Sequence, residues 1–168
     1  MLIFANSKNF MRQSKIHIFL LTFMLFVCLS SSCEKQQQHP VPSSYVNFTI
    51  NLQTDSEFIR LTAPGNSMEI SYQMVNTFTL GFDNNGVIVY NAGDGEFYAF
   101  DRTCPYDMPN SVAVETDGTG VLATCPVCGT EYVFPSMGTP TFDGPGTWPL
   151  REYKVYYNQN NGVLSVYN

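Results

Sequence analysis

The feature that most constrains the fold is a series of short segments in which apolar residues occupy every second position. In the segment 46–52, Val46, Phe48, Ile50 and Leu52 alternate with polar residues. This alternation is typical of a β-strand that buries one face. The other segments that we predict to be strands are residues 68–74, 77–82, 87–91, 96–101, 111–115, 120–124, 130–134, 150–157 and 162–168.

Turn residues separate these segments at short intervals. The chain contains 10 prolines and 12 glycines, and the sequences at 83–86, 93–95 and 158–162 are typical of hairpin turns. No segment has the apolar spacing of an amphipathic helix. With 14% aromatic residues available for a core, the sequence predicts an all-β sandwich or barrel.

The N-terminal residues are typical of an export signal. Three basic residues precede the apolar segment 16–29, which is shorter than the roughly 20 residues of a membrane-spanning helix. The sequence Ser-Ser-Ser-Cys follows and resembles a bacterial lipobox with Cys33 as the lipid-modified residue. An uncleaved anchor helix is the alternative. We predict a lipoprotein signal peptide at 1–32, a flexible tether at 33–44 that begins with lipidated Cys33, and a folded domain at 45–168.

The charge pattern excludes some classes of function. All 14 Asp and Glu lie from residue 34 onward, where there are only five Lys and Arg. A domain this acidic lacks the basic surface that neutralises phosphates, so we expect no nucleic-acid partner. No Ser–His–Asp, phosphate-loop or dinucleotide motif is present. The sequence therefore contains no catalytic constellation. The export signal and the lipobox predict a protein of the bacterial cell envelope that is bound to a membrane by its lipid.

Three cysteines lie in the predicted domain. Cys104 follows the strand predicted at 96–101, and Cys125 and Cys128 follow the strand predicted at 120–124. Cys104 and Cys125 are each followed by a proline, which stiffens a loop. This arrangement predicts two loops that approach one site.

The layout resembles the Rieske family. That family carries C-x-H on one hairpin loop and C-x-x-H on a second, and its two Cys and two His hold a [2Fe–2S] cluster. The matching segments here are "EFYAFDRTCPYD", "CPVCGTEYVF" and "GTPTFDGPGTWPLREYKV", in that order, within residues 45–168. The resemblance implies stacked antiparallel sheets, two cysteine-bearing hairpin loops, a Pro-rich covering loop and electron transfer through the cluster.

The ligand positions depart from that pattern. Tyr106 stands in the first histidine position and Cys128 in the second, and His39 in the tether is the only histidine after the predicted signal peptide. One hypothesis is a [2Fe–2S] cluster held by Cys104, Cys125 and Cys128, with Tyr106, Asp107 or no residue as the fourth ligand. Anionic ligands in place of neutral imidazoles would lower its potential.

Two further hypotheses use the same cysteines differently. A disulfide could join Cys104 to Cys125, or to Cys128, in a cluster-free binding or structural lipoprotein, since exported proteins retain disulfides. Alternatively, Cys125 and Cys128 could form a redox dithiol or part of a Cys₃ zinc site, which would need a fourth ligand. Trp148 could be an exposed contact for a partner, but we expect its side chain to pack over the cysteine loops.

Overall fold

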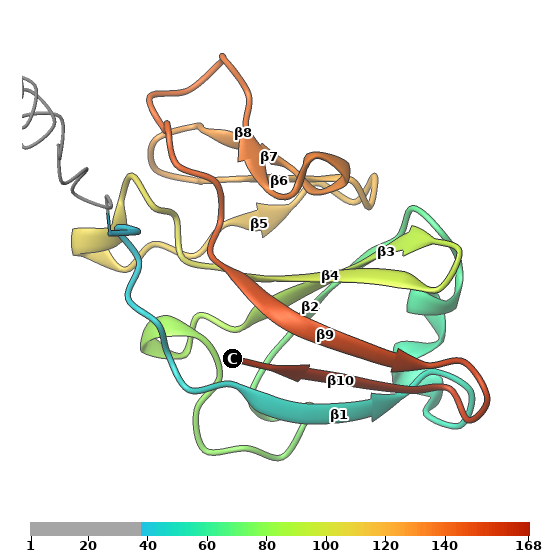
Figure 1. Cartoon of the computed structure of the whole chain (residues 1–168). Coiled ribbons are helices and arrows are strands. Elements are labelled where there is room, and N and C mark those ends of the chain that lie inside the picture. The colour runs from blue at the N-terminus through green and yellow to red at the C-terminus, as the bar shows by residue number, and fades with distance from the viewer. Residues whose placement is uncertain (1–37) are drawn as a thin grey trace, which may run out of the picture. The chain divides into compact units, whose positions relative to one another are not determined.

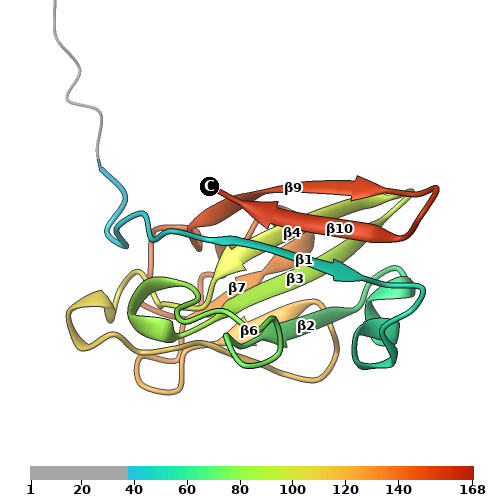
Figure 2. The ribbon, with the colours of Figure 1, turned by 90° about the horizontal axis from the view of Figure 1, so that it is seen from below.

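The computed structural model describes residues 38–168, which form an all-β domain with two antiparallel sheets (Figure 1). The larger sheet has the strand order β1-β10-β9-β4-β3-β2, and the smaller has the order β5-β6-β7-β8. Figure 2 shows β10 between β1 and β9. The strands are β1 (Asn47–Asn51), β2 (Ser67–Ile70), β3 (Val87–Gly93), β4 (Glu96–Asp101), β5 (Glu115–Thr116), β6 (Leu122–Thr124), β7 (Glu131–Val133), β8 (Thr139–Pro140), β9 (Glu152–Asn158) and β10 (Val163–Tyr167). The predicted fold class is confirmed.

Strand β3 contributes to two hydrophobic cores. Val87 and Val89 lie in a core with residues of β1, β9 and β10. Ile88 and Tyr90 point to the other face of the strand and pack with residues of the smaller sheet and with two of the cysteines. Burial on both faces explains why this strand is a continuous apolar run rather than an alternating one. The second core therefore attaches the cysteine loops to the larger sheet.

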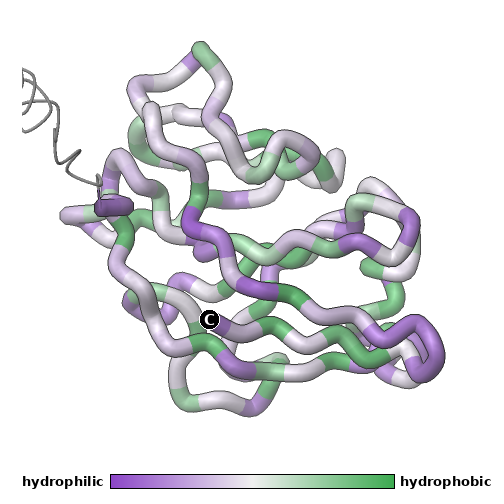
Figure 3. Tube along the Cα trace, viewed as in Figure 1, coloured by the Kyte–Doolittle hydropathy of each residue, from purple (hydrophilic) through white to green (hydrophobic). Residues whose placement is uncertain are grey.

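The turn between β9 and β10 is rich in polar residues. Figure 3 shows a hydrophilic loop between β9 and β10, which corresponds to the Asn- and Gln-rich turn predicted at 158–162. Asn161 and Gly162 both donate from the backbone to the carbonyl of Asn158.

Within the described residues, no helix is long and apolar enough to cross a membrane.

The strand predicted at residues 77–82 is wrong, and of the strand predicted at 111–115 only Glu115 lies in a strand, β5. Phe78 is 99% exposed, and the segment 77–82 is a loop that leads into the 3₁₀ helix η2 (Phe82–Asn84). Gly81 has a φ of 74°, and a Cβ there would lie 2.5 Å from the Gly86 carbonyl oxygen. The Asn84 side chain accepts a hydrogen bond from the Leu80 amide at 2.9 Å. These turn contacts replace strand pairing.

The sequence pattern also missed the short helix η1 (Ser56–Thr62). This element is a 3₁₀ helix that buries Phe58 and Leu61. Residues three apart align on a 3₁₀ helix, so its apolar spacing differs from the longer repeat that indicates an α-helix. The other 3₁₀ helices are η3 (Met108–Asn110) and η4 (Phe134–Ser136).

The segment 38–44, which the sequence assigns to a flexible tether, packs on the domain. Val41 is fully buried, and its carbonyl accepts a hydrogen bond from the Arg151 guanidinium. His39 Nε2 donates to the Pro149 carbonyl at 3.0 Å. The compact unit accordingly begins at residue 38. The predicted signal peptide and Cys33 lie outside the described residues.

Replacing Asp101 with asparagine will destabilise the domain by about 3 kcal/mol. The carboxylate is fully buried at the end of β4. It accepts hydrogen bonds from the Phe82 amide (2.7 Å), the Thr103 amide (2.8 Å) and the Tyr153 hydroxyl (2.6 Å). An amide group has one oxygen, so its nitrogen would face a donor. Urea unfolding measures the loss, and Asp94→Asn, at an exposed hairpin position, is the control. Equal stability of both variants would contradict the assigned role.

Candidate metal centre

The first cysteine loop continues directly from β4. Thr103 forms an isolated β-bridge with Ala113, and the Cys104 amide donates to the Val112 carbonyl at 2.8 Å. The intervening turn contains η3 and ends at Ser111, which has a φ of 52°. This closed loop holds Cys104 fully buried in the second core.

The second cysteine loop is the hairpin between β6 and β7. The Cys125 amide donates to the Thr130 carbonyl at 2.9 Å, and the Gly129 amide donates to the Cys125 carbonyl at 2.9 Å. Gly129 has a φ of 74°, which glycine adopts at little cost. The C-P-V-C-G sequence therefore forms a tight turn that places Cys125 and Cys128 on the same side.

The Pro-rich third loop packs on the second. The Gly146 amide donates to Thr130 Oγ1 at 3.0 Å. A Cβ on Gly144 would lie 2.4 Å from Thr130 Cα, and one on Gly146 would lie 2.7 Å from Thr130 Cγ2. Gly144 is thus required by close approach to the Thr130 backbone, and Gly146 packs closely on the Thr130 side chain. The expected covering loop is confirmed in its contact with the second cysteine loop.

The two cysteine loops bring four potential ligands together. The Sγ atoms of Cys104, Cys125 and Cys128 and a carboxylate oxygen of Asp107 all lie within 4.8 Å of one another. Cys104 Sγ is 3.8 Å from Cys128 Sγ. Asp107 Oδ2 is 3.2 Å from Cys125 Sγ and 4.0 Å from Cys104 Sγ. In the structure all three cysteines are free thiols.

A buried tyrosine supports the site, and the sequence analysis missed it. Tyr132 on β7 is fully buried, and its hydroxyl lies 3.2 Å from Cys104 Sγ. Burial is the main cause that raises the pKa of Tyr132 well above its ordinary value, and the hydrogen bond to Cys104 raises it further. The hydroxyl therefore stays protonated and can donate to the sulfur. The alternation in β7 already indicated that Tyr132 faces inward.

The thiols have an environment unlike that of a redox dithiol. Burial raises the pKa of Cys125 well above its ordinary value, and burial also raises the pKa of Cys128. A reactive C-x-x-C has a lowered thiol pKa, often because it opens a helix. Here a turn and strand β7 follow. The site therefore lacks the two features that make a C-x-x-C pair reactive in thiol–disulfide exchange.

Two other residues singled out in the sequence, Tyr106 and Trp148, are less buried than three of the four potential ligands. Tyr106 is 54% exposed, whereas its neighbour Asp107 is buried and belongs to the group of four. Trp148 is half-buried and its ring meets the His39 ring edge-on, with centroids 5.6 Å apart. Trp148 thus packs against the N-terminal segment of the domain.

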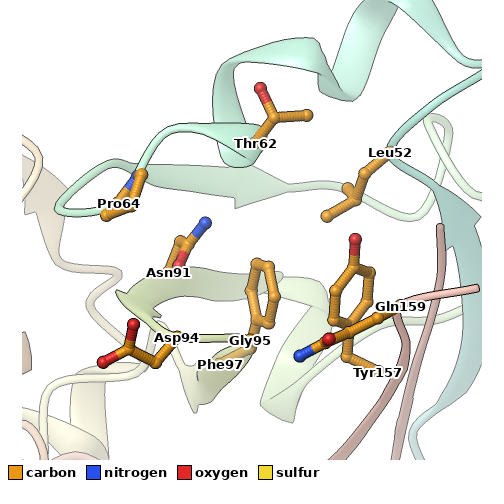
Figure 4. A pocket seen from close by; sticks show the side chains of 9 residues that line it. All are labelled: Leu52, Thr62, Pro64, Asn91, Asp94, Gly95, Phe97, Tyr157 and Gln159. Atoms are coloured by element: carbon orange, nitrogen blue, oxygen red, sulfur yellow. The ribbon is translucent and has the colours of Figure 1, made fainter.

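A separate hollow of about 480 Å³ lies away from the cysteine loops (Figure 4). The Phe97 and Tyr157 rings, with centroids 4.8 Å apart, form part of its wall. The Asn91 side chain there donates to the Leu61 carbonyl and accepts from the Gly93 amide. Its polar atoms are therefore engaged in holding η1 and the β3–β4 hairpin.

Solved structures similar to this chain include two ferredoxins and a reductase subunit. No family model and no curated protein matches the sequence. Among solved structures, the ferredoxin of carbazole 1,9a-dioxygenase from Nocardioides aromaticivorans IC177 matches with a TM-score of 0.40 and 20% identity, over 74% of this chain and 98% of that chain. The Sphingomonas yanoikuyae B1 ferredoxin matches with a TM-score of 0.42 and 16% identity, over 74% and 99%.

A third similar structure is the putative NADH-dependent nitrite reductase small subunit from Mycobacterium tuberculosis. It has a TM-score of 0.39 and 15% identity, over 75% of this chain and 97% of that chain.

Proposed function

We propose that this chain is a lipid-anchored envelope protein whose Rieske-like domain binds a metal through its two cysteine loops. The observation that carries the proposal is the convergence of Cys104, Asp107, Cys125 and Cys128 within 4.8 Å. Three thiols and a carboxylate form a ligand set typical of thiophilic metals. The Rieske-like assignment rests on the order of the two cysteine loops and the Pro-rich loop along the chain.

A [2Fe–2S] cluster does not fit these four ligands. In such a cluster each iron has its own pair of protein ligands. If each terminal bond is about 2.3 Å long, it extends about 1.3 Å outward along the iron–iron axis. Ligands on opposite irons are then separated by about 2.7 Å plus the iron–iron distance, and diagonal pairs by still more. With any iron–iron distance above about 2 Å, ligands on opposite irons would therefore be more than 4.8 Å apart. The four ligand atoms observed here all lie within 4.8 Å of one another.

We therefore propose metal binding without the electron-transfer role that the family resemblance implies. The metal would join the first cysteine loop to the second and so stabilise the domain, as structural metals do in small proteins. The ligand atoms come from both loops, and three of the four residues are buried. This supports a structural centre beneath the surface formed by the loop tips.

Removal of the metal will lower the melting temperature of the full chain by roughly 10 °C, given a metal concentration far above the dissociation constant. Differential scanning calorimetry of the protein in detergent, with and without a strong chelator, measures the change. Adding the metal back should restore the transition. A melting temperature that chelation leaves unchanged would contradict the proposal.

The rival is a cluster-free domain in which a disulfide joins the cysteine loops. The 3.8 Å separation of Cys104 Sγ and Cys128 Sγ favours it, because a small movement would bring the sulfurs to a bonding distance of about 2.05 Å. Thiol titration of the purified protein separates the two proposals. A disulfide leaves one accessible site thiol after unfolding without reductant, whereas a metal centre yields three.

Cys33→Ser will abolish the attachment of fatty acid to the protein. Without the cysteine thiol, the predicted lipobox cannot be acylated or processed at that position, and the apolar segment 16–29 stays on the chain. Incorporation of radiolabelled palmitate measures the modification, and Cys28→Ser, inside the predicted apolar segment, is the matched control. A wild-type protein that incorporates no palmitate would favour the uncleaved anchor helix.

A further inference from the structure

We infer that Cys104, Asp107, Cys125 and Cys128 form a closed tetrahedral site for a single thiophilic divalent ion, with Zn²⁺ as the expected occupant. This inference rests on the proposed metal binding and specifies its nuclearity, geometry and fourth ligand. It replaces the two-iron cluster implied by the family resemblance with one ion. It also completes the Cys₃ zinc hypothesis, since Asp107 supplies the ligand that the three cysteines lack.

Three of the six ligand-to-ligand distances lie close to the edges of one coordination tetrahedron. Two thiolates bound to the same ion at about 2.3 Å lie about 3.8 Å apart. The Cys104 and Cys128 sulfurs are 3.8 Å apart. A carboxylate oxygen at about 2.1 Å from the ion would lie about 3.6 Å from each thiolate. The distances from Asp107 Oδ2 to Cys125 Sγ and Cys104 Sγ are 3.2 and 4.0 Å, on either side of that value.

Asp107 lacks a cation to balance its charge. Its side chain is only 8% exposed and faces the Cys104 and Cys125 sulfurs. Among the residues that the structure describes, one salt bridge is present, between Arg102 and Glu69. No basic side chain in this part of the chain pairs with Asp107. A buried carboxylate of this kind is costly unless a counterion compensates it. A metal ion at the centre of the four ligands would provide that compensation.

The surrounding hydrogen bonds also suit a metal site. Tyr132 lies within hydrogen-bonding distance of Cys104 Sγ, and Thr130 Oγ1 lies 3.2 Å from Cys128 Sγ. Groups of this kind orient metal ligands and help to fix their geometry. Four protein ligands leave no open coordination position, which is the arrangement of structural zinc sites rather than catalytic ones. Thiolates also select against Mg²⁺ and Ca²⁺, which prefer oxygen ligands.

Titration of the metal-free full chain with Co²⁺ tests this inference. The protein is kept in detergent without oxygen, and a background variant, Cys28→Ser with Cys33→Ser, leaves the site thiols as the only ones. We expect one Co²⁺ per chain, with strong visible absorption of tetrahedral cobalt and ultraviolet thiolate-to-cobalt bands. A weak octahedral spectrum, or a stoichiometry of two, would overturn the single tetrahedral site.

Asp107→Asn tests the fourth ligand. In the same background it should weaken Co²⁺ binding by about 10- to 100-fold and change the visible spectrum, because a neutral amide is a poor ligand for this ion. Asp143→Asn, at an exposed position in the third loop, should leave both unchanged. Unaltered affinity and spectrum in Asp107→Asn would overturn its role as ligand, and circular dichroism establishes that the variant is folded.

The outcomes separate this inference from the proposed function. If reconstitution with iron and sulfide gives two irons and two sulfides per chain, the single-ion site is wrong but metal binding stands. If neither Co²⁺, Zn²⁺ nor iron with sulfide binds to the reduced protein, the proposed function fails as well. Stoichiometric binding of one Zn²⁺, in competition with a chelator of known affinity, supports both.

Discussion

Cys125→Ser will weaken Zn²⁺ binding by about 100-fold or more, which is the largest effect that we expect from a single substitution. Structural zinc sites bind with apparent free energies of about 10–16 kcal/mol, shared among four ligands. Loss of one ligand therefore costs about 3 kcal/mol or more. Cys125 is 1% exposed, so water cannot readily replace its sulfur. Competition with a chelator measures the dissociation constant.

The control for this variant is Cys33→Ser, which replaces a cysteine outside the described residues and should leave the zinc affinity unchanged in detergent. Near-ultraviolet circular dichroism of metal-free Cys125→Ser establishes whether the aromatic core is still packed. Wild-type zinc affinity in a folded Cys125→Ser variant would show that the metal does not bind at the converging loops.

Gly144→Ala will destabilise the domain by about 3 kcal/mol or more and lower its melting temperature by roughly 10 °C. The added methyl group would lie 2.4 Å from Thr130 Cα and 2.5 Å from Thr130 Oγ1. Because the nearest atom belongs to the backbone, the third loop must move away from the second. This movement would also disturb the contact between Thr130 Oγ1 and Cys128 Sγ. Calorimetry measures the melting temperature.

Gly118→Ala separates steric collision from backbone strain. Gly118 has a φ of 81°, but a Cβ there would have no atom within 4 Å. We expect a cost of about 1 kcal/mol from the left-handed conformation alone. Equal melting temperatures for the Gly144→Ala and Gly118→Ala variants would contradict the close packing of the third loop on Thr130.

The sequence predicted most of the strands because their pattern reflects the faces that they bury. The alternation in 46–52 became β1, and the apolar run at 87–91 became β3, which is buried on both faces. The segment 77–82 also alternates, yet Gly81 and Asn84 form turn contacts that prevent it from pairing. Local alternation does not indicate whether a partner strand is available.

The site was partly predictable. The positions of Cys104, Cys125 and Cys128 indicated that two loops would meet, and the structure brings all three together. Asp107 was one of several candidates for the fourth ligand, and only the fold shows that its carboxylate, rather than the exposed Tyr106, faces the sulfurs. Tyr132 was missed because its role depends on contact with a sulfur 28 positions away in the chain.

The metal and acid-labile sulfide content of the full chain, purified from its own cells without oxygen, tests the central claim most directly. The ligand distances predict one zinc ion per chain, no sulfide, and three site thiols that become free when the protein is unfolded with a chelator. Two irons with two sulfides per chain, or a metal-free protein with a disulfide between the cysteine loops, would contradict this account.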